Sequence, residues 1–260
     1  MGSSQADMNI VKVNEALDLY IFTDQQAKHQ DTISVVVQNG QALIIDTAFP
    51  RYAERVKQHL EARQVEAQVV ILSHYHADHA SGASVFGHCR IYASEYYEAN
   101  FNNCRVWEPQ YTFVRPLHLI RDGDRLAFGD FDLAFFHTPG HSQDSLVIRL
   151  ADSIFHVGDL LMMTKEQKAS LPFIADGGDF GQHVDSLERL KQLDPDILLL
   201  PHGGLVQDRQ RIAGMIDDRL YYLERTASSF GTLPLPACLR RQVSDYDHLE
   251  FHDTNLMQLL

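Results

Sequence analysis

The pattern of apolar and polar positions in the first half of the chain predicts strands and one helix. The apolar runs ISVVVQ (33–38) and ALIIDT (42–47) flank Asn39-Gly40, a dipeptide that favours a two-residue hairpin turn. Residues 52–62 then place apolar side chains at helical spacing and predict an amphipathic helix. The run VVILS (69–73) lacks polar alternation, which predicts a strand covered on both faces.

The second half repeats this order. Short apolar runs separated by turn residues predict strands over residues 117–159. Further elements follow: a helix over 183–193, a strand over 196–202, a helix over 208–225 and a short helix after Asp253. Strands followed by helices occur twice, which indicates an α/β sandwich of two mixed sheets face to face with helices outside.

Composition narrows the class of protein. The chain has 260 residues, 45% of them apolar, enough for one large domain with a sizeable core. Its formal net charge is −13 and it has no Lys/Arg run, so we expect no nucleic-acid partner. No stretch is apolar enough to span a membrane, and the N-terminus predicts no signal peptide. Three scattered cysteines without a CxxC motif favour a reduced, cytoplasmic setting.

Candidate chemistry is concentrated in SHYHADHA (73–80), directly after the strand predicted over 69–73. A single histidine is usually an ordinary packed or solvated residue, but four candidate ligands lie within six positions. His74 and His76 can share one face because they are alternate residues, and Asp78 and His79 follow at once. Imidazole and carboxylate suit zinc, iron or manganese. Four such groups exceed the needs of one open tetrahedral site, which indicates two neighbouring metals.

Three further candidate ligands follow other predicted strands. They are His141 in TPGHSQDS, Asp159 in VGD and His202 in PHGG. Each lies next to a glycine, which lets the backbone pack closely around a metal. The sequence therefore offers seven metal-binding groups at strand ends.

These motifs, in this order and at these separations, resemble the metallo-β-lactamase-fold hydrolase superfamily over roughly residues 10–205. The resemblance implies an αββα sandwich, with a catalytic domain over 8–205 and a helical extension over 206–260 packed on it. The first metal would be held by His74, His76 and His141. The second would be held by Asp78, His79 and His202, with Asp159 bridging both.

By the same resemblance, Asp46 in LIIDT supports the site from behind the ligands, and Asp78 counts as catalytic as well as a ligand. Two divalent metals, with zinc expected and iron or manganese as alternatives, would share a hydroxide that attacks the substrate. We expect the substrate to be a small ester, thioester or lactone. A phosphodiesterase, a mononuclear-iron enzyme like the sulfur dioxygenases and a β-lactamase are the alternatives. Lactamases proper lack the bridging aspartate, which disfavours the last.

Other residues carry weaker expectations. His137, His156 and His183 are candidates to support the site, whereas the remaining histidines (His29, His59, His88, His118, His248 and His252) are interpreted as ordinary. The aromatic, loop-like segment 96–113 and the segment 171–180 are either a wall of the substrate cleft or part of the core. Residues 221–223 are either a homodimer face or core. The basic ACLRRQV (237–243) is too short to match the C-terminal segment with which glutathione thioesterases hold their substrate.

Overall fold

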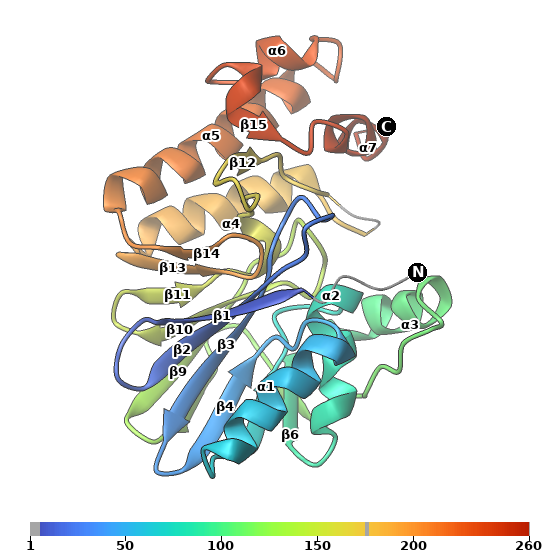
Figure 1. Cartoon of the computed structure of the whole chain (residues 1–260). Helices are drawn as coiled ribbons and strands as arrows, with labels where there is room; N and C mark the ends of the chain where they lie inside the picture. Colours follow the sequence, from blue (N-terminus) through green and yellow to red (C-terminus); the bar gives the residue numbers. More distant parts are fainter. Residues whose placement is uncertain (1–5, 175–176, 260) are drawn as a thin grey trace.

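Two mixed β-sheets lie face to face between layers of helices (Figure 1). The structure, a computed structural model, describes residues 6–174 and 177–259. The first sheet contains, in spatial order, β1 (Asp7–Lys12), β2 (Leu17–Thr23), β3 (Asp31–Gln38), β4 (Gln41–Ile45), β5 (Glu66–Ile71), β6 (Arg90–Ser94) and β7 (His118–Ile120). The second contains β14 (Gly204–Val206), β13 (Ile197–Leu200), β11 (Ile154–His156), β10 (Leu146–Ala151), β9 (Phe131–His137) and β8 (Arg125–Phe128).

Both sheets are mixed, as the sequence predicts. Strands β1 to β4 pair antiparallel, and β4 to β7 pair parallel. In the second sheet only β11 and β13 are parallel. The predicted hairpin joins β3 to β4 through Asn39 and Gly40, whose φ angles of +52° and +76° suit a type I′ turn. The carboxyl ends of β4, β5 and β6 therefore meet at one edge of the first sheet.

Three apolar layers fix this arrangement. Side chains such as Leu43, Ile71 and Leu146 fill the space between the sheets. The outer face of the first sheet packs against α1 (Pro50–Ala62), the 3₁₀ turn η1 (Ser81–Phe86) and α3 (Glu98–Trp107). The outer face of the second sheet packs against α4 (Phe180–Gln192) and α5 (Arg209–Ser228). The predicted αββα sandwich is confirmed.

One local expectation was wrong. The segment 96–113, interpreted as loop-like, contains helix α3. Phe101 and Cys104 are one helical turn apart, both are buried, and no Gly or Pro interrupts the helix. Its many aromatic residues obscured this spacing. Both interpretations of the segment apply in part, because Phe101 and Phe113 belong to the core whereas Trp107 stays half exposed.

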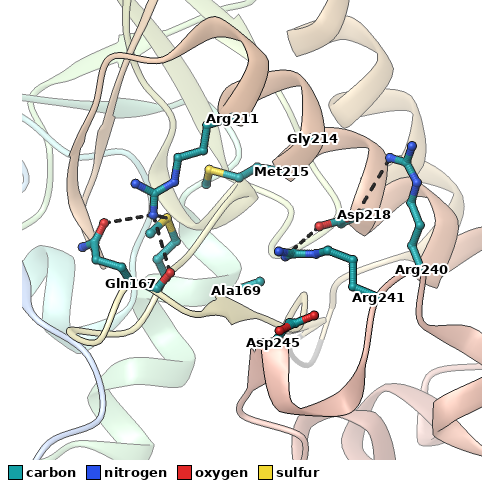
Figure 2. Close-up of a pocket in the computed structure, with 10 residues that line it drawn as sticks. Gln167, Ala169, Arg211, Gly214, Met215, Asp218, Arg240, Arg241 and Asp245 are labelled. Atoms are coloured by element: carbon teal, nitrogen blue, oxygen red, sulfur yellow. Dashed lines mark hydrogen bonds and ion pairs between the residues drawn. The ribbon is translucent and has the colours of Figure 1, made fainter.

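The last part of the chain crosses over the edge of the sandwich, and we call residues 239–259 the C-terminal strap. It contains the 3₁₀ turn η3 (Val243–Asp245), β15 (Tyr246–Asp247) and α7 (Phe251–Met257), and it follows α6 (Leu235–Cys238). Strand β15 pairs in parallel with β12 (Ala169–Ser170). Figure 2 shows the other attachment, where Arg241 lies 2.8 Å from the Asp218 carboxylate of α5. The strap is thus fixed to the face of the second sheet.

Some expectations about the ends and divisions of the chain stay predictions. Residues 1–5, on which the signal-peptide expectation partly rests, lie outside the described part of the chain, as do 175–176 within the segment 171–180 and residue 260. The division into domains at residues 205 and 206 also stays a prediction.

Among the described residues, no helix has the length and apolar character needed to cross a membrane. Tyr222 and Leu223 are buried in the core, and only Tyr221 of that trio is exposed.

Candidate metal centre

Three histidines converge at the carboxyl end of β5. His74 and His76 follow that strand, and His141 follows β9 across the gap between the sheets. Their side-chain nitrogens lie 3.0 to 3.2 Å from one another: Nε2 of His74, Nδ1 of His76 and Nε2 of His141. Ligand nitrogens around a tetrahedral zinc stand roughly 3.3 Å apart, so this spacing suits a shared metal.

A second group lies beside the first. Helix α2 (Ala77–Ala80) begins directly after His76 and carries Asp78 and His79. His202, which follows β13, places Nε2 3.2 Å from the Asp78 carboxylate, and His79 Nε2 lies 3.8 Å from the other oxygen of Asp78. The structure thus brings together the three residues that the resemblance assigns to a second metal.

Asp159 lies between the two groups. It belongs to the 3₁₀ turn η2 (Gly158–Leu160), directly after β11. One carboxylate oxygen is 3.6 Å from Nε2 of His141, and the other is 3.3 Å from Nε2 of His79 and 3.7 Å from Nε2 of His202. A carboxylate in this position can bridge two cations, one through each oxygen.

Asp46 orients the site from behind the ligands. It follows β4 with a left-handed φ of +55° and is fully buried. Its carboxylate accepts hydrogen bonds from the backbone N–H of Ser73 (2.7 Å), the Ser73 hydroxyl (2.8 Å) and Nδ1 of His79 (2.8 Å). The last bond fixes the His79 tautomer, leaving Nε2 directed at the cluster.

Backbone carbonyls orient two more histidines in the same way. Nδ1 of His141 donates to the Phe173 carbonyl (2.6 Å), and Nδ1 of His202 donates to the Gln30 carbonyl (3.0 Å). Each bond leaves Nε2 directed toward the other candidate ligands. Such second hydrogen bonds are usual for metal-binding histidines.

The electrostatics of the two groups differ. Burial lowers the pKa of His74 and His76, and it lowers the pKa of His141 to about 4. Burial also opposes the charge of His202, yet the nearby Asp159 and Asp78 raise its pKa to about 9. The pKa of His79 is raised against burial by its three carboxylate neighbours. The three-histidine group is therefore neutral at pH 7, whereas the second group holds protons.

Two buried atoms test whether the site fits a metal. His79 Nε2 and Asp159 Oδ1 are both buried, and neither has a hydrogen-bond partner among the described residues. Leaving such groups without partners costs about 1–3 kcal/mol each. A cation between them would satisfy both, and the donor set of imidazole nitrogens and carboxylate oxygens suits zinc, iron or manganese. The residues present therefore fit a metal.

Two cavities meet at the cluster, and His76, Asp78 and Phe173 line both. The larger, of about 440 Å³, extends toward α3. The smaller, of about 210 Å³, lies between the ligands and the C-terminal strap, which contributes His248 and Phe251. A pocket elsewhere, between the strap and α5, is lined by Arg211, Arg240 and Arg241 and contains none of the cluster residues (Figure 2).

Sequence reasoning missed several residues of the site. His29 and His248 were interpreted as ordinary, yet both line the smaller cavity, and the His29 ring lies 4.4 Å from that of His202. Asp31 lies 3.6 Å from Nδ1 of His202. Asp144 accepts hydrogen bonds from the Tyr75 backbone N–H, Asn100 and Ser142, which ties the loop of His141 to that of His74. Of these residues, only Asp144 could have been suspected from the sequence, because it lies in the motif TPGHSQDS.

The three histidines predicted to support the site, His137, His156 and His183, differ in how close they lie to it. His156 is buried with Nε2 3.6 Å from the Asp46 carboxylate, close enough to influence it. His183 is buried against Gly140, beside His141, but lines neither cavity. His137 donates to the Gln143 carbonyl (2.7 Å) and stacks on Tyr96, outside both cavities.

The fold and this cluster of strand-end ligands define a metal-binding α/β sandwich of one particular kind. The sequence pattern of the "Metallo-beta-lactamase superfamily" matches residues 29–202, and the chain belongs to this superfamily. The match covers every candidate ligand and both sheets except β1, β2 and β14.

Relatives carry several names. The chain is 27% identical to a protein named hydroxyacylglutathione hydrolase from Tolumonas auensis over 67% of this chain and 62% of the relative. It is 24% identical to the "Lactamase-like protein nscB" of Arthroderma gypseum over 75% of this chain and 56% of the relative. The chain thus spans about three fifths of the length of these curated relatives.

Solved structures agree on the fold. The DIM-1 metallo-beta-lactamase aligns with a TM-score of 0.64 over 82% of this chain and 99% of that chain, at 16% identity. A metallo-beta-lactamase from Pontibacter korlensis aligns equally well, with a TM-score of 0.64 at 16% identity, over 82% of this chain and 100% of that one. At this identity the likeness shows the architecture.

Proposed function

We propose that the protein is a binuclear metal-dependent hydrolase of small esters or thioesters. The observation that carries this proposal is the position of Asp159, whose two oxygens face the three-histidine group and the His79/His202 group respectively. A single-metal site would not need a carboxylate shared in this way. The superfamily membership and the relatives named hydroxyacylglutathione hydrolase support the reaction class.

The proposed roles follow the geometry. His74, His76 and His141 would hold one divalent metal, Asp78, His79 and His202 would hold the other, and Asp159 would contact both. Such a pair, with zinc as the proposed metal, would lower the pKa of a bound water and polarise the substrate carbonyl. Asp46 keeps Nδ1 of His79 protonated and Nε2 free. Asp78 lines both cavities, so it is a ligand that also meets the substrate and counts as catalytic.

The alternatives are less well supported. A phosphodiester is an anion, and no Lys or Arg lines either cavity among the described residues. A mononuclear-iron enzyme would leave the second ligand group without a role. The β-lactamase structures share the fold, which is compatible with many reactions. Three free, buried cysteines fit the proposed cytoplasmic location.

One preparation tests the proposal. Metal content is measured first, and the same sample is assayed with a simple thioester, a lactone and bis(p-nitrophenyl) phosphate. We expect two metals per chain and a preference for the carbonyl substrates. One iron per chain with oxygen consumption would contradict the proposal, as would a preference for the phosphodiester.

A further inference from the structure

The larger cavity opens from the metal ligands into an apolar cleft. It is continuous with the cluster because His76 and Asp78 belong to its wall. Its other walls come from separate parts of the chain: Phe49 before α1, Trp107 at the end of α3, Phe173 after β12, and Thr254 in α7 of the strap. A substrate whose carbonyl reaches the ligands must therefore place one of its two substituents along these side chains.

The polar groups of this cleft carry no positive charge. Glu108 is its acidic wall residue besides Asp78, and Lys and Arg are absent from the described residues that line it. The residues outside the described part of the chain include no Lys or Arg either. The Cys104 thiol donates to the Tyr75 carbonyl (2.8 Å), and burial raises its pKa to about 12, so it is no nucleophile.

Two cations close to these walls already have partners. Arg51 stacks on the rings of Phe49 and Tyr52 and donates to the Tyr52 hydroxyl (2.9 Å). Lys28, near the smaller cavity, lies 2.9 Å from the Glu250 carboxylate and 3.2 Å from that of Asp247.

The basic ACLRRQV segment does not reach the cleft. Arg240 lies 3.3 Å from the Asp217 carboxylate of α5. Arg241 lies 2.8 Å and Arg240 3.9 Å from the carboxylate of Asp218 in the same helix (Figure 2). They line the separate pocket beside α5, which shares no residue with the larger cavity. The strap therefore uses its two adjacent arginines for attachment to α5.

We propose that this cleft binds an apolar acyl group and that the natural substrate is an acyl ester or thioester whose carrier is not glutathione. The inference rests on the proposed hydrolase function and adds the substrate class. Glutathione carries two carboxylates and a net negative charge at pH 7, and neither cavity offers them a Lys or Arg side chain among the described residues. An aliphatic or aromatic acyl chain would instead contact Phe49, Trp107 and Phe173.

Acyl group and carrier can be varied independently to test this. The metal-loaded protein is assayed with acetyl, butanoyl, hexanoyl and benzoyl thioesters of N-acetylcysteamine, which is uncharged, and with the same acyl groups on glutathione. We expect kcat/KM to rise about fourfold for each added methylene until the cleft is full. At equal acyl group, the N-acetylcysteamine thioester is expected to equal or exceed the glutathione thioester.

Two neighbouring residues of α3 give a matched pair of variants. Trp107 lines the cleft and is 53% exposed, whereas Val106 is 74% exposed and lines neither cavity. Trp107→Ala should flatten the dependence on chain length, and Val106→Ala should leave it unchanged. Arg51→Gln serves as a second test, because it would selectively slow the glutathione thioesters if Arg51 held their carboxylates.

A binding measurement separates this inference from the hydrolase function. Acetohydroxamic and octanohydroxamic acid are titrated calorimetrically into the metal-loaded wild type and Trp107→Ala. Tighter binding of the longer acid to the wild type alone supports the acyl cleft even if no ester is hydrolysed, in which case the hydrolase proposal fails. Hydrolysis without chain-length dependence, or a preference for glutathione thioesters, overturns the inference while the hydrolase function stands. Absence of both activity and hydroxamate binding overturns both.

Discussion

The two halves of the candidate metal site differ in how the charge of their histidines is controlled. The half made of His74, His76 and His141 contains only nitrogen ligands, whose charge is suppressed by burial. The half made of Asp78, His79 and His202 contains a carboxylate and lies against Asp159, so its histidines hold protons that balance this negative charge. One half is ready to bind a cation, whereas the other must first release protons.

This contrast shows that burial and nearby charges act in opposite directions on the protonation of a histidine. Burial alone keeps an imidazole neutral, but the same burial with two carboxylates at 3–4 Å favours the imidazolium. A metal bound in the second half would replace those protons as the positive charge that balances the carboxylates. Asp159 is the residue on which the two halves depend in common.

Removing Asp159 should therefore have the largest effect. Asp159→Ala is expected to lower kcat/KM by more than the roughly 100-fold typical for losing a hydrogen bond to a metal ligand. The metal content should fall below two per chain while circular dichroism shows a folded protein. His76→Ala, confined to the first half, is the companion variant. Near-normal rates in either variant would show that the shared site is not catalytic.

Asp46→Asn should have a smaller effect, a loss of roughly 10–100-fold in kcat/KM. The amide keeps the shape but replaces one oxygen that accepts from Ser73 or His79 by a donor. His79 is then free to change tautomer, which weakens the second half alone. Metal analysis should show selective loss of one equivalent. Damage equal to that of Asp159→Ala would instead make Asp46 a ligand.

Chelation measures the contribution of both halves to stability. A ligand present at a thousand times its Kd stabilises a folded protein by about 4 kcal/mol. Removing the metals with EDTA should therefore lower the melting temperature by on the order of 10 °C for a domain of this size. The same treatment should lower the melting temperature of Asp159→Ala by less, because this variant is expected to bind fewer metals at the start. A wild-type protein that melts unchanged after chelation would argue against bound metal.

The smallest expected effect is the release of protons when a metal binds. It should differ between the two halves of the candidate metal site. At pH 7 the first half is neutral, because its pKa values are lowered, to about 4 for His141, so metal binding there releases few protons. His202, with its pKa raised to about 9, is protonated at pH 7 and must lose its proton to bind. Calorimetric titrations of zinc in buffers of different ionisation enthalpy should show about one proton or more released with the second equivalent only. Affinity in the second half should rise with pH up to about 9. Equal release for both equivalents would remove the distinction.

The seven candidate ligands could be selected from the sequence because they lie in local motifs that follow short apolar runs. HYHADH contains four of them, and strand ends in one sandwich face the same edge. Asp159 and His202 could be found from the glycine next to each. In the structure these side chains form three groups that could hold a metal: His74 with His76 and His141, His74 with His79 and Asp159, and Asp78 with His202, His29 and Asp31. Their roles as ligands stay a prediction.

The residues around the ligands could not be predicted from local patterns. His29 and His248 are separated by more than 200 positions, and both reach the smaller cavity because Lys28 pairs with Asp247 and Glu250 of the strap. Asn255 likewise bonds to the Ile174 N–H (3.0 Å) and the Pro172 carbonyl (2.7 Å), which positions Phe173. Such contacts join segments that are far apart in the sequence, and the spacing of apolar residues within one segment carries no information about them.

The attachment of the strap has a consequence for how the cavity walls of this protein can change. The ligands lie within residues 29–202, whereas His248, Phe251 and Thr254 of the cavity walls come from the strap beyond them. Because Arg240 and Arg241 fix the strap to α5, substitutions along its inner side can alter the walls without moving a metal ligand. Laboratory evolution toward new acyl groups is therefore best directed at residues 248–254, where selectivity can be altered separately from reactivity.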